Sequence, residues 1–358
     1  MIIEGLSLVI RGFFSKYWTG DNKNGMQLST FLQSKTNLFI CRTLGWRFSY
    51  GYIAFLGKLY FFFRRKERRT IKHAIHAVFL GQKSKAEIRE TTRAVFRGII
   101  SHYFEKLFNA YSSTELLKAF FESHVRCDNI NVMKESLTDG KGALLITGHF
   151  GGVELIPGYL GVNQIPVSII AKFKTDHLRQ TLFDKCSAFS TRIIDPNLTP
   201  NVIKEICSNL KENRIVVTQC DEIEEWRPSK KDKIFFLGKL VWLDKTMNIL
   251  TKRTQAAILF GLMHRSKSSG YEFIVTPLND MAKQLKHHAE ASLGEILLKG
   301  LESFIYQYPE DWYEWKKYFR METVPSEQIL QEPLVPEPVL STTVLKPTRK
   351  TILSPNPL

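Results

Sequence analysis

The chain has 358 residues, of which 44% are hydrophobic, and this excludes a disordered protein and suffices for one large α/β domain. Its formal net charge of +15 favours an anionic partner: a nucleic acid, an anionic membrane surface or an acidic carrier protein. The five cysteines are odd in number and show no C-x-x-C spacing, so we expect a reducing, cytoplasm-facing environment with neither a disulfide framework nor a zinc site.

The first 72 residues form an apolar and basic segment. Residues 1–30 make a poor signal peptide, because they lack a basic start and a long apolar core. Residues 38–63 are rich in aromatic groups, but three basic residues interrupt them, and a spanning helix needs ~20 residues with few charges. We therefore predict helices that lie in a membrane interface.

Six basic residues follow within 64–72. They favour attachment to an anionic membrane surface, and a solvated basic helix face is the alternative. We expect no nucleic-acid binding, because the chain has no zinc-finger, RNP-like or helix-turn-helix pattern. Apolar residues then recur at the helical period over residues 83–121, which predicts helix packed on a core.

The most informative stretch starts with the apolar run 143–146, which predicts a short strand buried on both faces. Gly148 ends the strand, and a helix is expected to begin near residue 153. Between them, Gly151 and Gly152 leave room for another backbone or a ligand to come close, so both are candidate substrate-binding residues.

His149 and Glu154 lie on either side of this predicted strand-to-helix corner. If Glu154 reaches back to His149, its carboxylate fixes the imidazole tautomer and stabilises the imidazolium that forms when a hydroxyl proton is taken. A histidine near a glutamate is often incidental. The glycine-rich corner favours the catalytic interpretation, because ligands bind beyond the carboxyl ends of strands in open parallel sheets.

The stretch His149-Phe-Gly-Gly-Val-Glu154 resembles the His-x4-Asp/Glu motif of the glycerolipid and lipid A acyltransferases. It is most similar to the late, lauroyl- or myristoyl-type lipid A acyltransferases, which add a secondary fatty acyl chain to a lipid A precursor. The resemblance implies that His149 is the base and that Glu154 orients it. It also implies an acyl thioester as co-substrate, with no metal and no cofactor.

The segments around this corner alternate between short apolar runs and helical patterns. Strands are expected at 125–131, 143–146, 165–171, 214–218, 256–260 and 271–277, and helices at 132–139, 202–213, 246–257 and 289–308. We therefore predict an α/β fold with a mostly parallel central sheet flanked by helices, over residues 73–323.

Three further residues are candidates for substrate binding. Lys185 and Arg179 follow the strand 165–171, and the resembled family carries cations in this region that hold phosphates or the acidic carrier. Surface cations are the alternative for both. Asp221 matches an aspartate that the family places at a strand end, and we expect it on the same sheet edge as His149 as an acceptor-binding or supporting group. Capping of the next turn is its alternative role.

The segment Pro309-Glu-Asp-Trp-Tyr-Glu-Trp315 resembles the closing Pro-Glu-x-Trp-x-Trp segment of the family. We interpret its tryptophans as packing residues. Residues 324–358 hold seven of the fourteen prolines and little periodicity, which predicts a disordered or extended tail.

Together with these patterns, the resemblance implies a membrane-attached acyltransferase at the cytoplasmic face of the inner membrane. The acyl donor is expected to be acyl carrier protein or acyl-CoA, and the acceptor a hydroxyl of an anionic, lipid A-type glycolipid. Acylation of another lysolipid or glycolipid is the rival within enzymes. A catalytically silent, membrane-bound lipid-binding protein is the rival from another class.

Overall fold

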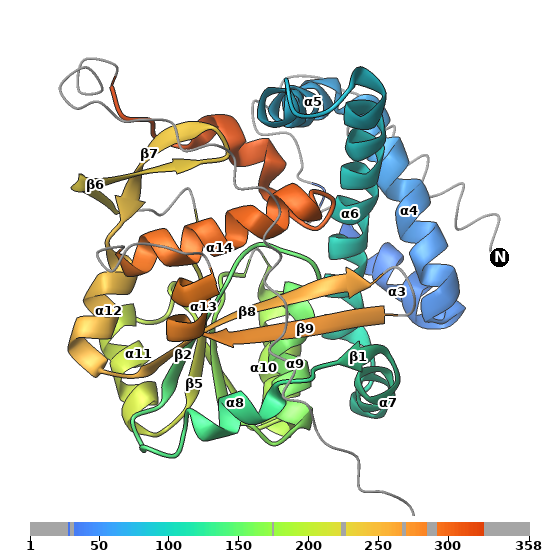
Figure 1. The fold of residues 1–358 in the computed structure, drawn as a ribbon. Helices are drawn as coiled ribbons and strands as arrows, with labels where there is room; N and C mark the ends of the chain where they lie inside the picture. The colour runs from blue at the N-terminus through green and yellow to red at the C-terminus, as the bar shows by residue number, and fades with distance from the viewer. Residues whose placement is uncertain are drawn as a thin grey trace, which may run out of the picture.

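The structure is a computed structural model that describes residues 28, 32–173, 175–222, 227–266, 270–284 and 292–325. Its centre is a seven-stranded sheet in the order β1-β9-β8-β2-β5-β3-β4 (Figure 1). The strands are β1 (Val125–Arg126), β2 (Ala143–Thr147), β3 (Val167–Ile170), β4 (Thr191–Ile194), β5 (Ile215–Gln219), β8 (Ala257–Ser266) and β9 (Gly270–Pro277). All neighbouring strands run parallel except β8 and β9. The predicted α/β fold with a mostly parallel sheet is therefore confirmed.

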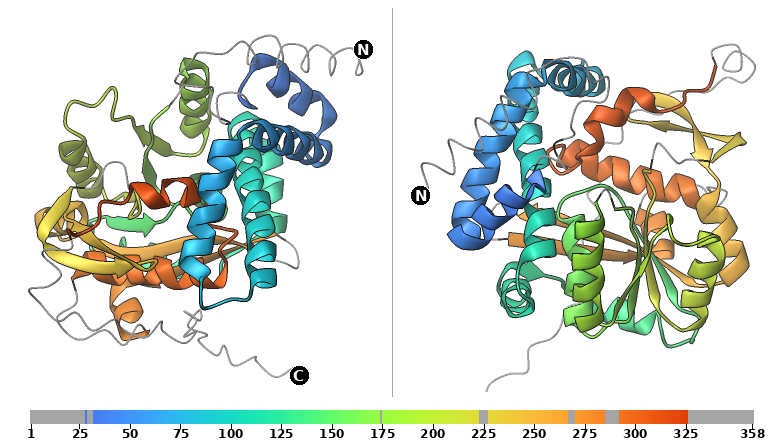
Figure 2. Two further views of the ribbon diagram at one scale, coloured as in Figure 1. Left: turned by 90° about the horizontal axis from the view of Figure 1, so that it is seen from above. Right: turned by 180° about the vertical axis from the view of Figure 1, so that it is seen from behind.

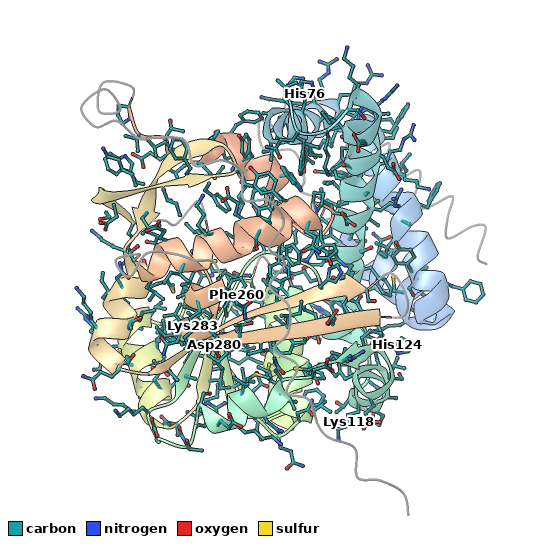
Figure 3. The ribbon with its side chains drawn as sticks, viewed as in Figure 1. His76, Lys118, His124, Phe260, Asp280 and Lys283 are labelled. Atoms are coloured by element: carbon teal, nitrogen blue, oxygen red, sulfur yellow. The ribbon has the colours of Figure 1, made fainter. Side chains whose placement is uncertain are left out.

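Helices cover both faces of this sheet. They are α8 (Ile130–Glu135), α9 (Ile156–Val162), α10 (Asp176–Ala188), α11 (Val202–Lys211), α12 (Thr246–Thr254), α13 (Leu278–Gln284) and α14 (Leu293–Gln307). Helices α13 and α14 lie on one side, and α10 and α11 lie on the other (Figures 1 and 2). Phe260 of β8 is buried in the core, whereas Asp280 and Lys283 of α13 have accessible side chains that pair at 3.3 Å; Figure 3 labels all three residues.

Strand β2 carries the site and lies between β5 and β8. All five of its residues are buried. A strand in the middle of a sheet that is covered on both faces has no side for water, which is why its sequence is a continuous apolar run. The predicted strand at 143–146 is thus confirmed, and Thr147 extends it by one residue.

The N-terminal helices gather at one side of the sheet (Figure 1). They are α3 (Lys35–Leu44), α4 (Trp46–Phe63), α5 (Arg65–Phe79), α6 (Lys85–Tyr111) and α7 (Thr114–His124). Helix α6 starts with a capping box formed by Ser84 and Glu87. The helix predicted over 83–121 is divided, because the Ser113 side chain caps a new helix. Within the described residues, none of the helices has the length and apolar character to cross a membrane.

Three parts of the sheet structure differ from the prediction. Edge strand β4 was not predicted. The strand expected at 125–131 has only two paired residues, because it lies at the sheet edge and its chain turns into α8. The hairpin of β6 (Pro228–Phe236) and β7 (Lys239–Asp244) was not predicted. It turns at Leu237 and Gly238, both with positive φ, of 50° and 78°.

The chain returns to this hairpin near its C-terminal end. After the 3-10 helix η3 (Glu314–Arg320), Thr323 bridges Val241 of β7. Val324, predicted as the first residue of the tail, is instead buried, and its N–H donates to the Leu240 carbonyl at 3.0 Å. The predicted tail lies outside the described residues from residue 326 onward. Residues 1–27 of the predicted N-terminal segment also lie outside them.

Candidate active site at the end of strand β2

His149 lies two residues beyond the carboxyl end of β2, and Asp221 lies two residues beyond the end of β5. The two strands are parallel neighbours, so their carboxyl ends meet at one edge of the sheet. The Cys220 N–H donates to the Thr147 carbonyl at 2.8 Å, which extends the pairing of β2 and β5 by one residue. This register places the Asp221 carboxylate against the His149 turn, on the sheet edge where the sequence analysis expected it.

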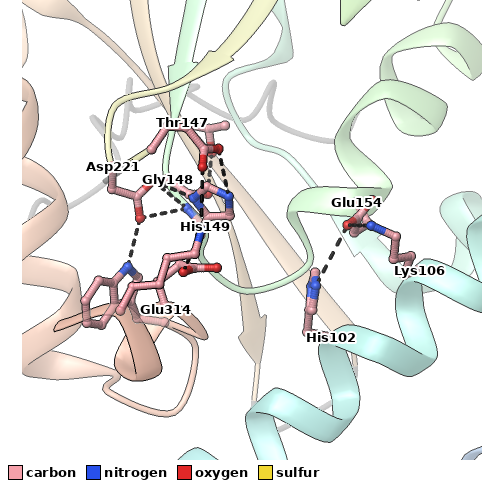
Figure 4. Close-up of polar contacts among 11 residues, drawn as sticks. His102, Lys106, Thr147, Gly148, His149, Glu154, Asp221 and Glu314 are labelled. Carbon is pink, nitrogen blue, oxygen red and sulfur yellow. Dashed lines mark hydrogen bonds and ion pairs between the residues drawn. The ribbon is translucent and has the colours of Figure 1, made fainter. Parts of the chain in front are cut away.

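Asp221 binds both the backbone and the ring of His149 (Figure 4). Its carboxylate accepts the His149 backbone N–H at 3.0 and 3.1 Å, and its Oδ1 lies 2.9 Å from His149 Nδ1. The Trp312 indole N–H donates to Oδ2 at 2.8 Å. The Asp221 side chain is fully buried, and 11% of the His149 side chain is exposed. A carboxylate at Nδ1 leaves Nε2 as the acceptor nitrogen of the neutral imidazole.

Charge and burial act on the imidazole in opposite directions. Burial alone lowers the pKa of His149, but the charge and hydrogen bond of Asp221, with the charges of Glu314 and Glu222, outweigh burial and raise it to about 9. Burial favours the protonated carboxyl of Asp221, yet the contacts with His149 and Trp312 hold the pKa of Asp221 below its ordinary value. The pair therefore stabilises an imidazolium, which is the state that a general base reaches after taking a proton.

Glu222 is the second carboxylate at this histidine. Its Oε2 lies 3.4 Å from His149 Nε2, and 38% of its side chain is exposed. Lys317 lies 3.5 Å from the same carboxylate. The reactive nitrogen of His149 is thus directed to the solvent-accessible side of the site, where a hydroxyl substrate has to bind in order to lose its proton.

The predicted contact between Glu154 and His149 is wrong. Glu154 instead pairs with Lys106 Nζ at 3.1 Å and lies 3.8 Å from His102 Nε2, and both partners come from α6 (Figure 4). The Asn109 amide donates to the Glu154 carbonyl at 2.9 Å. The reason is local geometry: the 3-10 turn η1 (Val153–Leu155) presents this side chain to α6 rather than back to the histidine. Asp221 occupies the position that the prediction gave to Glu154.

The glycines of the corner accommodate the protein's own backbone. Gly151 has a φ of +56°, and a Cβ there would lie 1.8 Å from the Met263 carbonyl oxygen. Its N–H donates to the Asp311 carbonyl at 2.8 Å, and the Gly152 N–H donates to Met263 at 2.8 Å. The sequence predicted that either another backbone or a ligand lies close to these glycines. In the structure it is the backbone of β8. Substrate binding by Gly151 and Gly152 is not supported, because both N–H groups are already engaged.

A buried ionic cluster holds this corner from the other side. The Arg265 guanidinium donates to the Gly151 carbonyl at 2.9 Å and binds both oxygens of Glu105, at 2.6 and 2.7 Å. It also donates to Asp311 at 2.8 Å, and His264 Nδ1 lies 2.7 Å from the other oxygen of Asp311. Glu105 and Asp311 are each 1% exposed. The cluster connects α6, β8 and the closing segment to the turn that carries His149.

Lys185 and Arg179 lie on α10 and have protein partners. The Lys185 ammonium donates to the carbonyls of Asn109 and Ser112 at 2.7 and 2.5 Å, where α6 ends and its last carbonyls lack helical partners. Burial lowers the pKa of Lys185 to about 8. Arg179 pairs with Asp176 at 2.7 Å, three residues earlier on the same helix. The predicted role of both cations in substrate binding stays a prediction.

The structure adds residues to the site that were not predicted there, among them Trp312, which was interpreted as a packing residue. Trp312 holds Asp221, and the Tyr313 N–H donates to the His149 carbonyl at 3.2 Å. His102 and Lys106 lie on a helix that was interpreted only by its apolar stripe. The signal was present, because polar residues recur at positions 102, 105, 106 and 109, on one face of α6, and buried polar faces of this kind need partners.

The fold and this geometry define a class: an α/β protein with a buried histidine–aspartate pair at the carboxyl end of a parallel strand, an arrangement that can take a proton from a hydroxyl. The family model for bacterial lipid A biosynthesis acyltransferases matches residues 30–321, and the chain belongs to this family. Family membership makes the protein an O-acyltransferase. A search of curated proteins finds no match.

Proposed function

We propose that this enzyme transfers a fatty acyl chain from a thioester donor to a hydroxyl of a lipid A-type glycolipid. Acyl carrier protein is the favoured donor and acyl-CoA the alternative. The observation that carries the proposal is the His149–Asp221 pair, which leaves Nε2 of the imidazole on the solvent-accessible side of the sheet edge, in a chain that belongs to an acyltransferase family. The formal charge of +15 suits both an acidic carrier and an anionic acceptor.

In the proposed reaction, His149 Nε2 takes the proton of the acceptor hydroxyl while the hydroxyl oxygen attacks the thioester carbonyl carbon. The electron pair of the C=O bond moves to the carbonyl oxygen, and Asp221 stabilises the imidazolium. When the C=O bond forms again, the C–S bond breaks, and the thiolate leaves with the proton from Nε2. The chain's own residues supply this route without a covalent enzyme intermediate, and the absence of a metal or cofactor stays a prediction.

Helix α4 presents a surface for an anionic bilayer. Phe48, Phe55 and Phe62 are spaced by seven residues, which is about two helical turns, so they share one face. They are 73%, 47% and 57% exposed. The opposite face is buried, and α4 packs there against α6. Exposed aromatic stripes beside basic residues favour the membrane interface, so we propose peripheral attachment at the cytoplasmic face of the inner membrane.

The function is tested with purified enzyme, acyl carrier protein loaded with a fatty acyl chain, and a phosphorylated lipid A precursor. Mass spectrometry should detect an acceptor that has gained one acyl chain, and the His149→Ala variant should form ~10²–10⁴-fold less of it per unit time. Acyl-CoA in place of the carrier protein identifies the donor. A product that forms only with another lysolipid would replace the proposed acceptor. No turnover with any donor would favour a silent lipid-binding protein.

A further inference from the structure

The proposed reaction places a negative charge on the thioester carbonyl oxygen, and backbone N–H groups at a corner of this kind are the usual donors to such an oxyanion. Here the first four N–H groups of the corner are occupied. That of His149 binds Asp221, and that of Phe150 donates to the Gly148 carbonyl at 2.7 Å. Those of Gly151 and Gly152 bind the closing segment and β8. Stabilisation of the oxyanion from this stretch of backbone is therefore excluded.

Tyr313 provides a donor next to the same histidine. Its ring packs edge-on against the His149 imidazole, with ring centroids 5.3 Å apart at 83°. Its N–H binds the His149 carbonyl, so the two residues keep a fixed spacing. The phenol hydroxyl makes no hydrogen bond to any residue that the structure describes. The hydroxyl is not among the fully buried polar atoms that lack a partner, so it is accessible to a ligand.

His102 holds the other face of the Tyr313 ring. The two rings stack with centroids 3.6 Å apart at 15°. His102 is 5% exposed, and its Nδ1 has no hydrogen-bond partner among the described residues. Burial, with the neighbouring cations Lys106 and Arg265, lowers the pKa of His102 well below its ordinary value, so a neutral ring supports the phenol. The tyrosine is therefore fixed between two histidines.

The charges around the Tyr313 phenol set its protonation. Burial raises the pKa of Tyr313 well above its ordinary value, and the carboxylates of Glu154, Glu314, Asp221 and Glu222 raise it further. The carboxylates that act on the phenol belong to both sides of the site: Asp221 and Glu222 contact His149, and Glu154 pairs with Lys106. A phenol in such surroundings stays protonated and acts as a hydrogen-bond donor.

Resting on the proposed function, we infer that the Tyr313 hydroxyl is the oxyanion donor of this enzyme. It donates to the carbonyl oxygen of the acyl thioester as the acceptor hydroxyl attacks, while His149 Nε2 takes the proton. Tyr313 is then a catalytic residue, and His102 is a positioning residue that acts through it.

The test is Tyr313→Phe, which keeps the ring, the stacking on His102 and the edge contact with His149, and removes only the O–H. Loss of one oxyanion donor typically lowers kcat by ~10²–10³-fold. We expect this loss in kcat with KM changed less than about threefold, because the interaction forms only in the transition state. Tyr308→Phe is the matched control, since Tyr308 also packs against a histidine, His264, at 3.8 Å, outside the site. It should keep wild-type kcat.

Incorporation of 3,5-difluorotyrosine at position 313 gives an independent readout. The fluorinated ring keeps the packing and lowers the pKa of the phenol, so kcat should acquire an alkaline decline that the wild-type enzyme lacks. This variant also decides the matter if Tyr313→Phe does not fold. A packing role would leave the pH profile unchanged.

A Tyr313→Phe enzyme with kcat within about threefold of wild type would overturn the inference, and so would a loss that appears mainly in KM. Wild-type enzyme and His149→Ala are assayed in the same series. If wild-type enzyme forms no product, the proposed function fails; if it does and Tyr313→Phe keeps its rate, only the role of Tyr313 fails.

Discussion

Among the described residues, two buried histidines direct Nδ1 at a buried aspartate. His149 lies 2.9 Å from Asp221, and His264 lies 2.7 Å from Asp311. Their exposures are similar, with 11% and 10% of the two histidine side chains accessible. Neither the burial of the histidine nor the distance to the aspartate therefore distinguishes the two pairs.

The two aspartates differ in what else they bind. Asp311 shares its charge with Arg265, a permanent cation, and serves the cluster that holds the corner. The other partners of Asp221 are the neutral N–H groups of Trp312 and the His149 backbone, so its full charge acts on the imidazole. The far side of the rings differs too: the His264 ring lies against Tyr308, whereas His149 Nε2 faces a partly exposed carboxylate. A cation beside the aspartate therefore distinguishes the structural pair, His264–Asp311, from the reactive pair, His149–Asp221.

The largest expected effect is loss of the charge at Asp221. Asp221→Asn keeps the shape but no longer stabilises the imidazolium or fixes its tautomer, so kcat/KM should fall ~10²–10⁴-fold. The double variant with His149→Ala should be little worse than either single variant, because residues that act as a unit are non-additive. Steady-state acyl transfer measures both. Losses that multiply in the double variant would contradict a joint role.

The next effect concerns stability at the second pair. Arg265→Met removes the cation that compensates Glu105 and Asp311, and breaking a buried ion pair typically costs ~3–5 kcal/mol. Urea denaturation followed by circular dichroism measures the free energy of unfolding. Arg179→Met is the control, since the partner of Arg179 among the described residues is the exposed Asp176, and this variant should change that free energy by less than about 1 kcal/mol. Equal losses in the two variants would contradict the structural role of the Arg265 cluster.

His→Phe substitutions compare the two histidines directly. Each removes the donor to a buried aspartate and keeps a ring, so each should cost about 1–3 kcal/mol in unfolding free energy. Only His149→Phe should abolish acyl transfer; His264→Phe should keep it within a few-fold per folded molecule. Denaturation and activity assays on the same preparations test this. Equivalent activity losses would remove the distinction between the pairs.

The smallest effect is expected at Glu222. Its carboxylate lies 3.4 Å from His149 Nε2 and contributes to the raised pKa of that ring. Glu222→Gln should therefore lower the pKa of His149 and move the acidic limb of kcat/KM to lower pH, by less than Asp221→Asn moves it. A pH-rate series on both variants ranks the two shifts. An unchanged pH dependence in Glu222→Gln would show that this carboxylate does not act on the ring.

The sequence predicted the parts of the site that depend on local pattern. The apolar run of β2 and the polar residue after β5 place His149 and Asp221 at one sheet edge, because the alternation of strands and helices predicts parallel strands and these have their carboxyl ends at the same edge. The partner of Glu154 was not predictable in this way. It depends on how α6 packs, and Lys106 lies 48 positions earlier in the chain. The same holds for Trp312, whose indole reaches Asp221 over a separation of 91 residues.

The central claim is that Asp221, and not Glu154, governs the basicity of His149. The direct measurement is the pH dependence of kcat/KM for wild type, Asp221→Asn and Glu154→Gln. The base must be unprotonated, so wild-type kcat/KM should rise about tenfold per pH unit and level off near the His149 pKa of about 9. Removal of the Asp221 charge makes the imidazolium less stable, so in Asp221→Asn the rise of kcat/KM with pH should occur at lower pH. In Glu154→Gln the rise should occur at the same pH as in wild type. A limb that moves with Glu154→Gln and stays with Asp221→Asn would contradict the account.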